Sequence, residues 1–158
     1  FLLAAARHRW RELRAVVVPL EREVMLAGRS FLFPGVKELL VHLRALGVAT
    51  ALASNCRSAY FDAVLRGQGL GELTDRHYCL DSPGVASKTD MVALALKEAG
   101  TRVAVMVGDR EPDHLAARAH ALPFVWRKNT RCSIPDAEGV WHGEPDALLR
   151  QLGLPAIS

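Results

Sequence analysis

The stretch that decides the fold is Val103–Asp113, which reads VAVMVGDREPD. Its first five residues, Val103–Val107, are all apolar and three are β-branched valines, which predicts a buried strand. Gly108 and Asp109 follow at once, and Asp113 comes one helical turn later. Because parallel sheets bind ligands at the carboxyl ends of their strands, Asp109 and Asp113 are candidate ligands of a hard cation. Asp109 taken alone could equally be the N-cap of the helix that follows.

The rest of the chain repeats this alternation of short apolar strands and helices. Further strands are predicted at 15–18, 48–53, 77–80 and 123–126, and helices at 34–46, 61–67, 88–99, 112–121 and 145–152. Apolar strands separated by helices predict an α/β fold with a doubly wound parallel sheet covered on both faces. We expect a single domain over 1–158, with an N-terminal helix or extension at 1–13, a core at 14–152 and a surface loop at 128–139.

Composition and charge narrow the functional classes. The 158 residues are 50% hydrophobic, 6% aromatic and 23% charged, which is typical of a globular domain. The longest apolar runs are too short to cross a bilayer, so no membrane insertion is expected. A net charge of +3 without a Lys/Arg block allows an RNA or acidic partner but does not predict one. The three cysteines form no C-x-x-C pair and are predicted to be reduced thiols.

Two further polar sites lie where a functional loop is expected. Ser54 and Asn55 follow the predicted strand at 48–53, and a hydroxyl with backbone N–H groups at a helix start suits a bound anion. A plain N-cap is the alternative interpretation of these two residues. Lys88 opens a helix, where the macrodipole disfavours a cation, so a facing anion would explain its position. A solvated side chain is the alternative for Lys88. We therefore predict a phosphate or anion site formed by Ser54, Asn55 and Lys88.

The order of these motifs resembles the haloacid dehalogenase (HAD) superfamily of phosphatases. The stretch 33–55, from FPGVKELL to ASN, is similar to the region of the family's second motif, and 105–113 to its fourth. The resemblance covers about 13–152, and each motif alone is weak. It implies an aspartate at the end of the first strand that attacks phosphorus, and a second aspartate that acts as general acid and base. It also implies that a Ser or Thr and a Lys hold the phosphoryl oxygens, while the fourth-motif acids Asp109 and Asp113 complete a Mg²⁺ site.

This sequence departs from the family pattern in its first motif. If the strand at 15–18 is the first strand, Pro19 stands at the position of the nucleophile and Glu21 at that of the general acid. Proline has no nucleophilic group, so Pro19, Glu21, Ser54 and Lys88 would be vestigial catalytic positions and metal binding would be weak. The alternative is that the nucleophile strand lies upstream of Phe1, with residues 1–33 as part of an inserted cap.

The resemblance also bears on the cap that usually sets the family's specificity. Only ten residues, Val24–Phe33, separate the degenerate first motif from the second, so a capless domain is expected. We therefore expect a catalytically inactive, phosphatase-like domain that acts as a structural or accessory subunit of a larger protein assembly. Its partners would be other protein subunits, with RNA as a further candidate. The alternatives are an active Mg²⁺-dependent phosphatase with an upstream nucleophile strand, and an anion-binding module.

Cofactor, location and contact surface complete the expectations. No cofactor is expected, or Mg²⁺ if activity is retained. The basic start of the chain, with Arg7, Arg11 and Arg14, can be the remnant of a transit sequence, so the location is cytoplasmic or organellar, with the mitochondrial matrix as a candidate. Aromatic side chains are candidate interface anchors, and at least two of the four are expected in the core. These four are Trp126, Trp141, Phe31 and Phe33.

Overall fold

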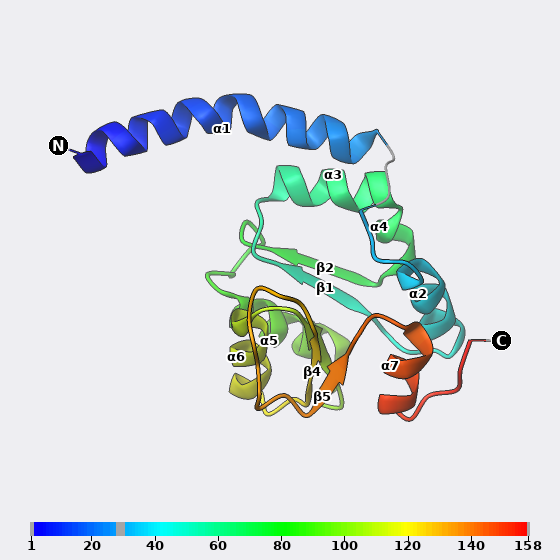
Figure 1. Cartoon of the computed structure of the whole chain (residues 1–158). Coiled ribbons are helices and arrows are strands. Elements are labelled where there is room, and N and C mark those ends of the chain that lie inside the picture. Colours follow the sequence, from blue (N-terminus) through cyan, green and yellow to red (C-terminus); the bar gives the residue numbers. More distant parts are fainter. Residues whose placement is uncertain (1, 28–30, 158) are drawn as a thin grey trace.

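The first helix occupies the segment in which the sequence analysis placed a strand. In this computed structural model, which describes residues 2–27 and 31–157, α1 (Leu2–Leu26) runs for 25 residues without interruption, across the boundary predicted at residue 14. Figure 1 shows α1 as one continuous helix lying across the rest of the molecule. The predicted strand at 15–18 is therefore wrong. Its β-branched run is flanked on both sides by Leu, Arg and Glu, which favour a helix, and the helix continues through Pro19.

The remaining elements alternate helices and short strands. They are α2 (Val36–Ala45), β1 (Ala51–Ser54), α3 (Ser58–Gln68), α4 (Leu70–Leu73), β2 (Arg76–Cys79), α5 (Lys88–Ala99), β3 (Met106–Gly108), α6 (Glu111–Ala119), β4 (Phe124–Arg127), β5 (Gly139–Trp141) and α7 (Pro145–Gln151). The α/β fold class is confirmed, and α5 has the predicted bounds. The sequence analysis missed α4 and β5, and it placed the start of β1 and of β3 too early.

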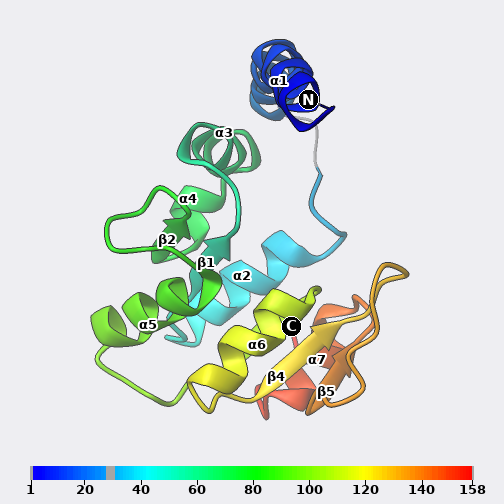
Figure 2. The ribbon, with the colours of Figure 1, turned by 90° about the vertical axis from the view of Figure 1, so that its left-hand side faces the viewer.

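The strands form two separate parallel sheets. β1 pairs with β2, with Ser54 opposite Cys79. In the other sheet β4 lies between β3 and β5, with Gly108 opposite Trp126. Within the described residues β1 and β3 are each paired along one edge only. Figure 2 shows β1 and β4 in different parts of the molecule, with α5 and α6 beside each other along one side.

The core is built around β4, whose successive side chains point to opposite faces of its sheet. Phe124 and Trp126 pack on one face in a cluster with side chains of α5, α6 and the loop at Ile134. Val125 packs on the other face against α2, α7 and Trp141. Both faces of this sheet are therefore covered, as the doubly wound prediction required. Neither cluster contains a residue of β1, β2 or α3.

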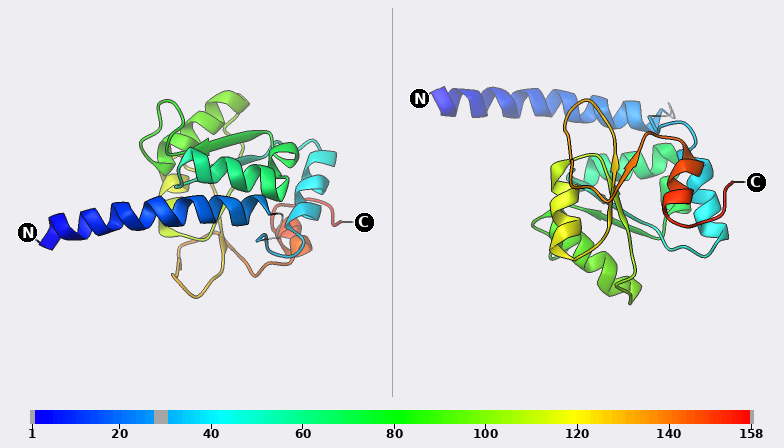
Figure 3. Two further views of the ribbon diagram at one scale, coloured as in Figure 1. Left: turned by 90° about the horizontal axis from the view of Figure 1, so that it is seen from above. Right: turned by 60° about the horizontal axis from the view of Figure 1, so that its bottom comes forward.

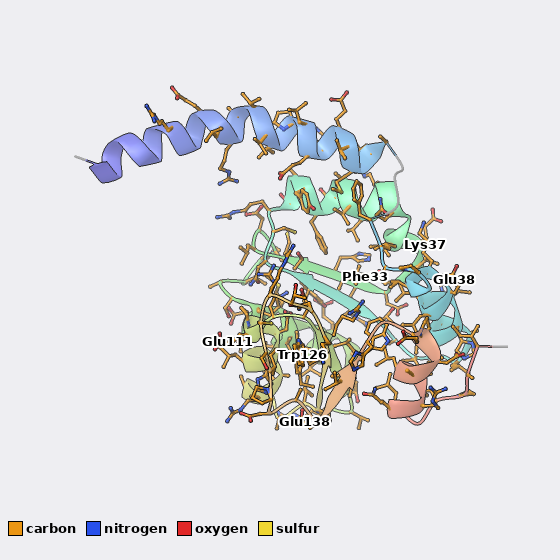
Figure 4. The ribbon with its side chains drawn as sticks, in the orientation of Figure 1. Phe33, Lys37, Glu38, Glu111, Trp126 and Glu138 are labelled. Carbon is orange, nitrogen blue, oxygen red and sulfur yellow. The ribbon has the colours of Figure 1, made fainter. Side chains whose placement is uncertain are left out.

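At least two of the four aromatic side chains lie in the core, as predicted. Trp126 and Trp141 are buried, at 7% and 6% exposure, whereas Phe31 and Phe33 are exposed. Figure 4 shows Trp126 inside the molecule and Phe33 at the approach to α2, near Lys37 and Glu38. The three cysteines are free thiols, as predicted.

Helix α1 packs on α3 and projects past the body of the molecule at its N-terminal end (Figure 3). Gly67 on α3 permits this contact, because a Cβ at that position would collide with the backbone of Met25. A stripe of apolar side chains on another side of α1 remains exposed, comprising Leu13, Val16, Val17, Leu20 and Val24. The side chains of Arg7 and Arg11, which the sequence analysis assigned to the remnant of a transit sequence, lie outside the described part of the structure. No helix among the described residues is both long and apolar enough to span a membrane.

Candidate functional site

Lys88 lies at the centre of the predicted site and is buried, at 9% exposure. Its Nζ donates to the carbonyl oxygen of Ala53 in β1 at 2.6 Å and lies 3.2 Å from Oδ1 of Asp113 in α6. The solvated alternative for Lys88 is therefore wrong. A buried ammonium requires an opposite charge, and Asp113 supplies it. Ser87 and Asp90 form a capping box at the start of α5, which fixes the turn from which Lys88 extends.

Asp113 has partners for both of its carboxylate oxygens. Oδ1 faces Lys88, and Oδ2 accepts hydrogen bonds from the backbone N–H groups of Asp109 at 3.2 Å and Arg110 at 3.1 Å. Asp113 is therefore the third helical residue of a capping box at the start of α6, whose N-cap residue is Arg110. The interpretation of Asp109 as the N-cap is wrong. Gly108 allows this approach, because a Cβ there would meet the Asp113 side chain at 2.5 Å.

The environment of Asp109 differs from that of Asp113. Its side chain is 49% exposed, and among the described residues its ion-pair partner is Arg110, at 3.5 Å between Oδ2 of Asp109 and Nε of Arg110. Glu111 is also exposed and lies at the edge of the molecule (Figure 4). Asp109 is thus the carboxylate of this loop that is open to a ligand.

The carboxylates of Asp109 and Asp113 meet the requirements of a Mg²⁺ site in part. The described residues contain no group of three or more His, Cys, Asp or Glu side chains that could hold a metal by themselves. Mg²⁺ usually binds one or two carboxylates together with water and substrate phosphate, so Asp109 can serve as one of its oxygen ligands. Asp113 is near enough to orient Asp109 through the backbone, and its own oxygens are engaged.

Ser54 and Asn55 lie at the carboxyl end of β1, beside Lys88. They are not N-caps, because α3 begins at Ser58 and the carboxylate of Asp81 accepts the hydrogen bond from the Ser58 N–H at 2.8 Å. Burial raises the pKa of the Cys56 thiol, while a hydrogen bond with Ser54 acts in the opposite direction. A pocket opens at this place, and Asn55, Lys88 and Pro112 are among its lining residues. The structure thus brings Ser54, Asn55 and Lys88 together at one end of β1.

The predicted first motif is not part of this site. Pro19 and Glu21 lie inside α1, not at the end of a strand. Glu21 is close to Tyr60 on α3: burial raises the pKa of Tyr60, and the charge of Glu21 raises it further. The assignment of Pro19 to the position of a nucleophile, and of Glu21 to that of a general acid, is therefore wrong.

Sequence analysis missed two residues that contact Asp109. Asn129 and Cys132 follow β4, and each donates a hydrogen bond to the Asp109 carbonyl oxygen. The rule that selected Ser54 and Asp109, a polar residue just after a strand, also selects Asn129. The prediction of one long surface loop from residue 128 to 139 hid this signal.

A family model of haloacid dehalogenase-like hydrolases matches residues 2–121, well over half of the chain. The chain belongs to this family. No separate cap domain is evident among the described residues of this HAD-like chain, and its motifs at 54–55, 88 and 108–113 lie together as the resemblance implied. No curated protein matches the chain.

Solved structures agree with the family assignment. A HAD-superfamily hydrolase of subfamily IA, variant 1, from Geobacter sulfurreducens is 26% identical, with a TM-score of 0.64 over 74% of this chain and 59% of that one. CbbY from Rhodobacter sphaeroides in complex with phosphate is 22% identical, with a TM-score of 0.68 over 77% and 58%. A predicted phosphoglycolate phosphatase from Haemophilus somnus is 21% identical, with a TM-score of 0.70 over 80% and 60%. The HAD-like chain thus spans under two thirds of the length of each of these structures.

Proposed function

We propose that this chain is part of an active Mg²⁺-dependent phosphatase, and that the nucleophilic aspartate lies on a strand that precedes residue 2. The observation that carries the proposal is the pair of open strand edges, one on β1 and one on β3. Inner strands of a doubly wound parallel sheet are normally paired along both edges. One additional parallel strand would join the two sheets into one.

The arrangement of the helices supports this position for the strand. α5 packs on β1 and β2, α6 packs on β3 and β4, and the two helices lie against each other. Lys88 of α5 contacts both Ala53 on β1 and Asp113 on α6. The open edges of β1 and β3 are therefore expected to face each other beneath the α5–α6 pair.

Exposed valines before and on β3 point to the same position. Val103 is 92% exposed, and Val105 and Val107 are each 37% exposed, although all three belong to the most apolar run of the chain. A β-branched side chain left in water at alternate positions is typical of a strand that lacks its neighbour. An apolar strand in the proposed position would bury these side chains.

The chemistry follows from what would meet at the carboxyl end of that strand. An aspartate there would lie between Ser54 on β1 and Asp109 after β3. Its carboxylate would attack the phosphorus of a bound phosphate ester while the P–O bond to the alcohol breaks and the alcohol leaves, and water would then release the phosphate from the aspartate. Lys88, Ser54 and Asn55 would bind the oxygens of the transferred phosphoryl group. Asp109 would hold Mg²⁺, which when bound offsets the negative charge of the phosphoryl group. Asp113 keeps Lys88 in place by pairing with its ammonium group.

The expectation of an inactive accessory subunit rested on the absence of a cap, on an otherwise intact fold and, above all, on Pro19 ending the first strand. Because Pro19 lies inside α1, that argument no longer supports a lost nucleophile. The spans of 58–60% of the similar structures also leave room for a strand and further residues that this chain does not contain.

The test is hydrolysis of p-nitrophenyl phosphate by the longest natural polypeptide that contains this chain. We expect Mg²⁺-dependent turnover that falls by several powers of ten in Asp109→Asn, and no turnover by residues 1–158 alone. Asp62→Asn, on the exposed side of α3, is the matched control and should keep its activity. Turnover that survives Asp109→Asn, or an upstream segment without an aspartate at a strand end, would contradict the proposal.

A further inference from the structure

The backbone of Asp109 is held from both sides. Its N–H group donates to Oδ2 of Asp113 at 3.2 Å. Its carbonyl oxygen accepts two hydrogen bonds, from Nδ2 of Asn129 at 2.7 Å and from Sγ of Cys132 at 3.0 Å. The carboxylate, in contrast, is half exposed and has Arg110 as its ion-pair partner. The direction of the Asp109 side chain is therefore set mainly through its main chain.

Asn129 is itself fixed at both ends of its amide group. Its Oδ1 accepts hydrogen bonds from the backbone N–H groups of Arg131 at 2.7 Å and Cys132 at 3.3 Å. Its Nδ2 also lies 3.5 Å from the carbonyl oxygen of Arg127. An Asn side chain that bonds the backbone two or three residues ahead shapes its own turn. In this turn the amide N–H₂ is left pointing out of the loop, at a residue 20 positions earlier in the chain.

The topology explains why these two loops meet. β3 and β4 are parallel neighbours, with Gly108 opposite Trp126, so the segments that follow them leave the sheet at the same edge. Asp109 is the first residue after β3, and Asn129 follows β4 by two positions. The shape of the loop after β4 thus controls the position of the loop after β3.

We propose that Asn129, assisted by Cys132, is the positioning residue that directs the carboxylate of Asp109 toward the metal. The proposal rests on the function proposed above, and it adds a residue outside the HAD-like motifs. Asn129 touches neither substrate nor metal in this role. It acts through the Asp109 carbonyl oxygen, as residues behind metal ligands commonly do by hydrogen bonding.

The competing explanation is that Asn129 only shapes the loop after β4. The two roles use different atoms of one side chain, so they can be separated. Asn129→Asp keeps an oxygen to accept from Arg131 and Cys132, but it loses the donor to Asp109 and places a carboxylate against a carbonyl oxygen. Asn129→Ala removes both interactions. Cys132→Ser keeps a donor to Asp109.

The experiment measures Mn²⁺ binding by paramagnetic broadening of backbone amide signals, using the same polypeptide as the phosphatase assay. For the unmodified protein we expect broadening centred on residues 108–110. Asn129→Ala and Asn129→Asp should each raise the Mn²⁺ concentration for half-broadening by about 10-fold or more, the usual effect of losing a residue behind a ligand. In Asn129→Asp this rise should occur in spite of the added negative charge. Cys132→Ser should stay within about 2-fold.

Thr130→Ala is the control within the same loop, since Thr130 is exposed and its side chain makes no hydrogen bond to any of the described residues. It should leave both Mn²⁺ binding and the melting temperature unchanged. Normal Mn²⁺ binding by Asn129→Asp would overturn the positioning role, and so would an absence of broadening at 108–110 in the unmodified protein. The readout does not require turnover, so the phosphatase proposal stands or falls separately, on the hydrolysis assay.

Discussion

The two sheets of the molecule are stabilised in different ways. The β3–β4–β5 sheet contributes to both apolar clusters, and Phe124 on its central strand has no exposed surface. The β1–β2 sheet contributes to neither cluster and is tied to its surroundings by polar side chains. Asp75, Asp81 and Glu98 each accept a hydrogen bond from a residue of this half, at 2.7, 2.8 and 2.7 Å. The β1–β2 half also buries apolar side chains, among them Tyr78 and Cys79, but outside the two clusters. The comparison therefore shows that this half relies more on individual polar contacts. One of these is the bridge that Lys88 forms between Ala53 on β1 and Asp113 on α6.

The largest effect on stability is expected at Lys88, which forms that bridge. Lys88→Ala leaves the buried carboxylate of Asp113 without its counter-charge, and losing one partner of a buried pair typically costs about 3–5 kcal/mol. We expect a matching fall in the free energy of unfolding, measured by urea denaturation. Lys97→Ala on the exposed side of the same helix should change it by about 0.5 kcal/mol or less. Equal, small effects of the two substitutions would show that the halves do not depend on the bridge.

A smaller effect is expected where α1 meets α3. Gly67→Ala adds a Cβ that would collide with the backbone of Met25, and a backbone atom cannot move aside cheaply. Such overpacking costs about 1–3 kcal/mol, here either as lost stability or as separation of α1 from α3. Thermal melting together with hydrogen exchange in α3 distinguishes these two outcomes. Gly71→Ala is the matched control, because a Cβ there meets nothing within 4 Å. Unchanged exchange and melting in Gly67→Ala would mean that α1 does not pack this closely.

The cap that Asp81 supplies to α3 should contribute less and should depend on pH. The Ser58 N–H group and then the Arg57 side chain lower the pKa of Asp81 from 3.8. A lowered pKa stabilises the fold above the ordinary value, and this contribution is lost as the pH falls through the pKa of the folded state. Asp81→Ala should therefore lower the melting temperature by a few degrees at pH 7 and by less below pH 3.8. Asp62→Ala should do neither, and a deficit that persists in acid would assign the effect to lost packing.

The smallest effect is confined to alkaline solution. Burial and the hydrogen bond to Glu98 raise the pKa of Tyr78 from 10.0 to about 12. A raised pKa contributes stability that is present below pH 10 and is lost as the pH rises toward 12. In Tyr60→Phe, which leaves Tyr78 as the single tyrosine, phenolate absorbance should rise near pH 12 while the protein stays folded. A rise near pH 10 would mean that Tyr78 is accessible to water.

The sequence predicted the region around β4 better than the region around α1, for physical reasons. Fully buried strands and capped helices produce unmistakable local patterns, as at Lys88–Ala99, where a capping box begins the helix and Gly100 ends it. The run Ala15–Val18 has the composition of a strand, but composition cannot show that the neighbours on both sides continue a helix through Pro19. Strand length was overestimated at 103–107, because pairing partners, not apolar residues, determine where a strand begins.

For the site residues too, local patterns were predicted correctly and contacts between distant residues were missed. The rule of polar residues after strands identified Ser54, Asn55 and Asp109, and helix start chemistry identified Lys88, all of which lie at one edge of the fold. The rule could not predict which of the two carboxylates is exposed. Asp109 and Asp113 differ in the groups that they contact, and the spacing of the two residues in the sequence does not show those contacts. The contact between Asn129 and Asp109 joins loops 20 residues apart and follows only from the parallel pairing of β3 with β4.

The open edge of β3 has a consequence for self-association. Unpaired N–H and C=O groups along a strand can pair with any extended chain that reaches them, and exposed valines beside them add an apolar attraction. Val107 on β3 and Val105 just before it are both partly exposed, and β3 has no lysine or proline of the kind with which natural edge strands discourage such contacts. A chain with this edge uncovered is a template for aggregation, so covering the edge also serves solubility.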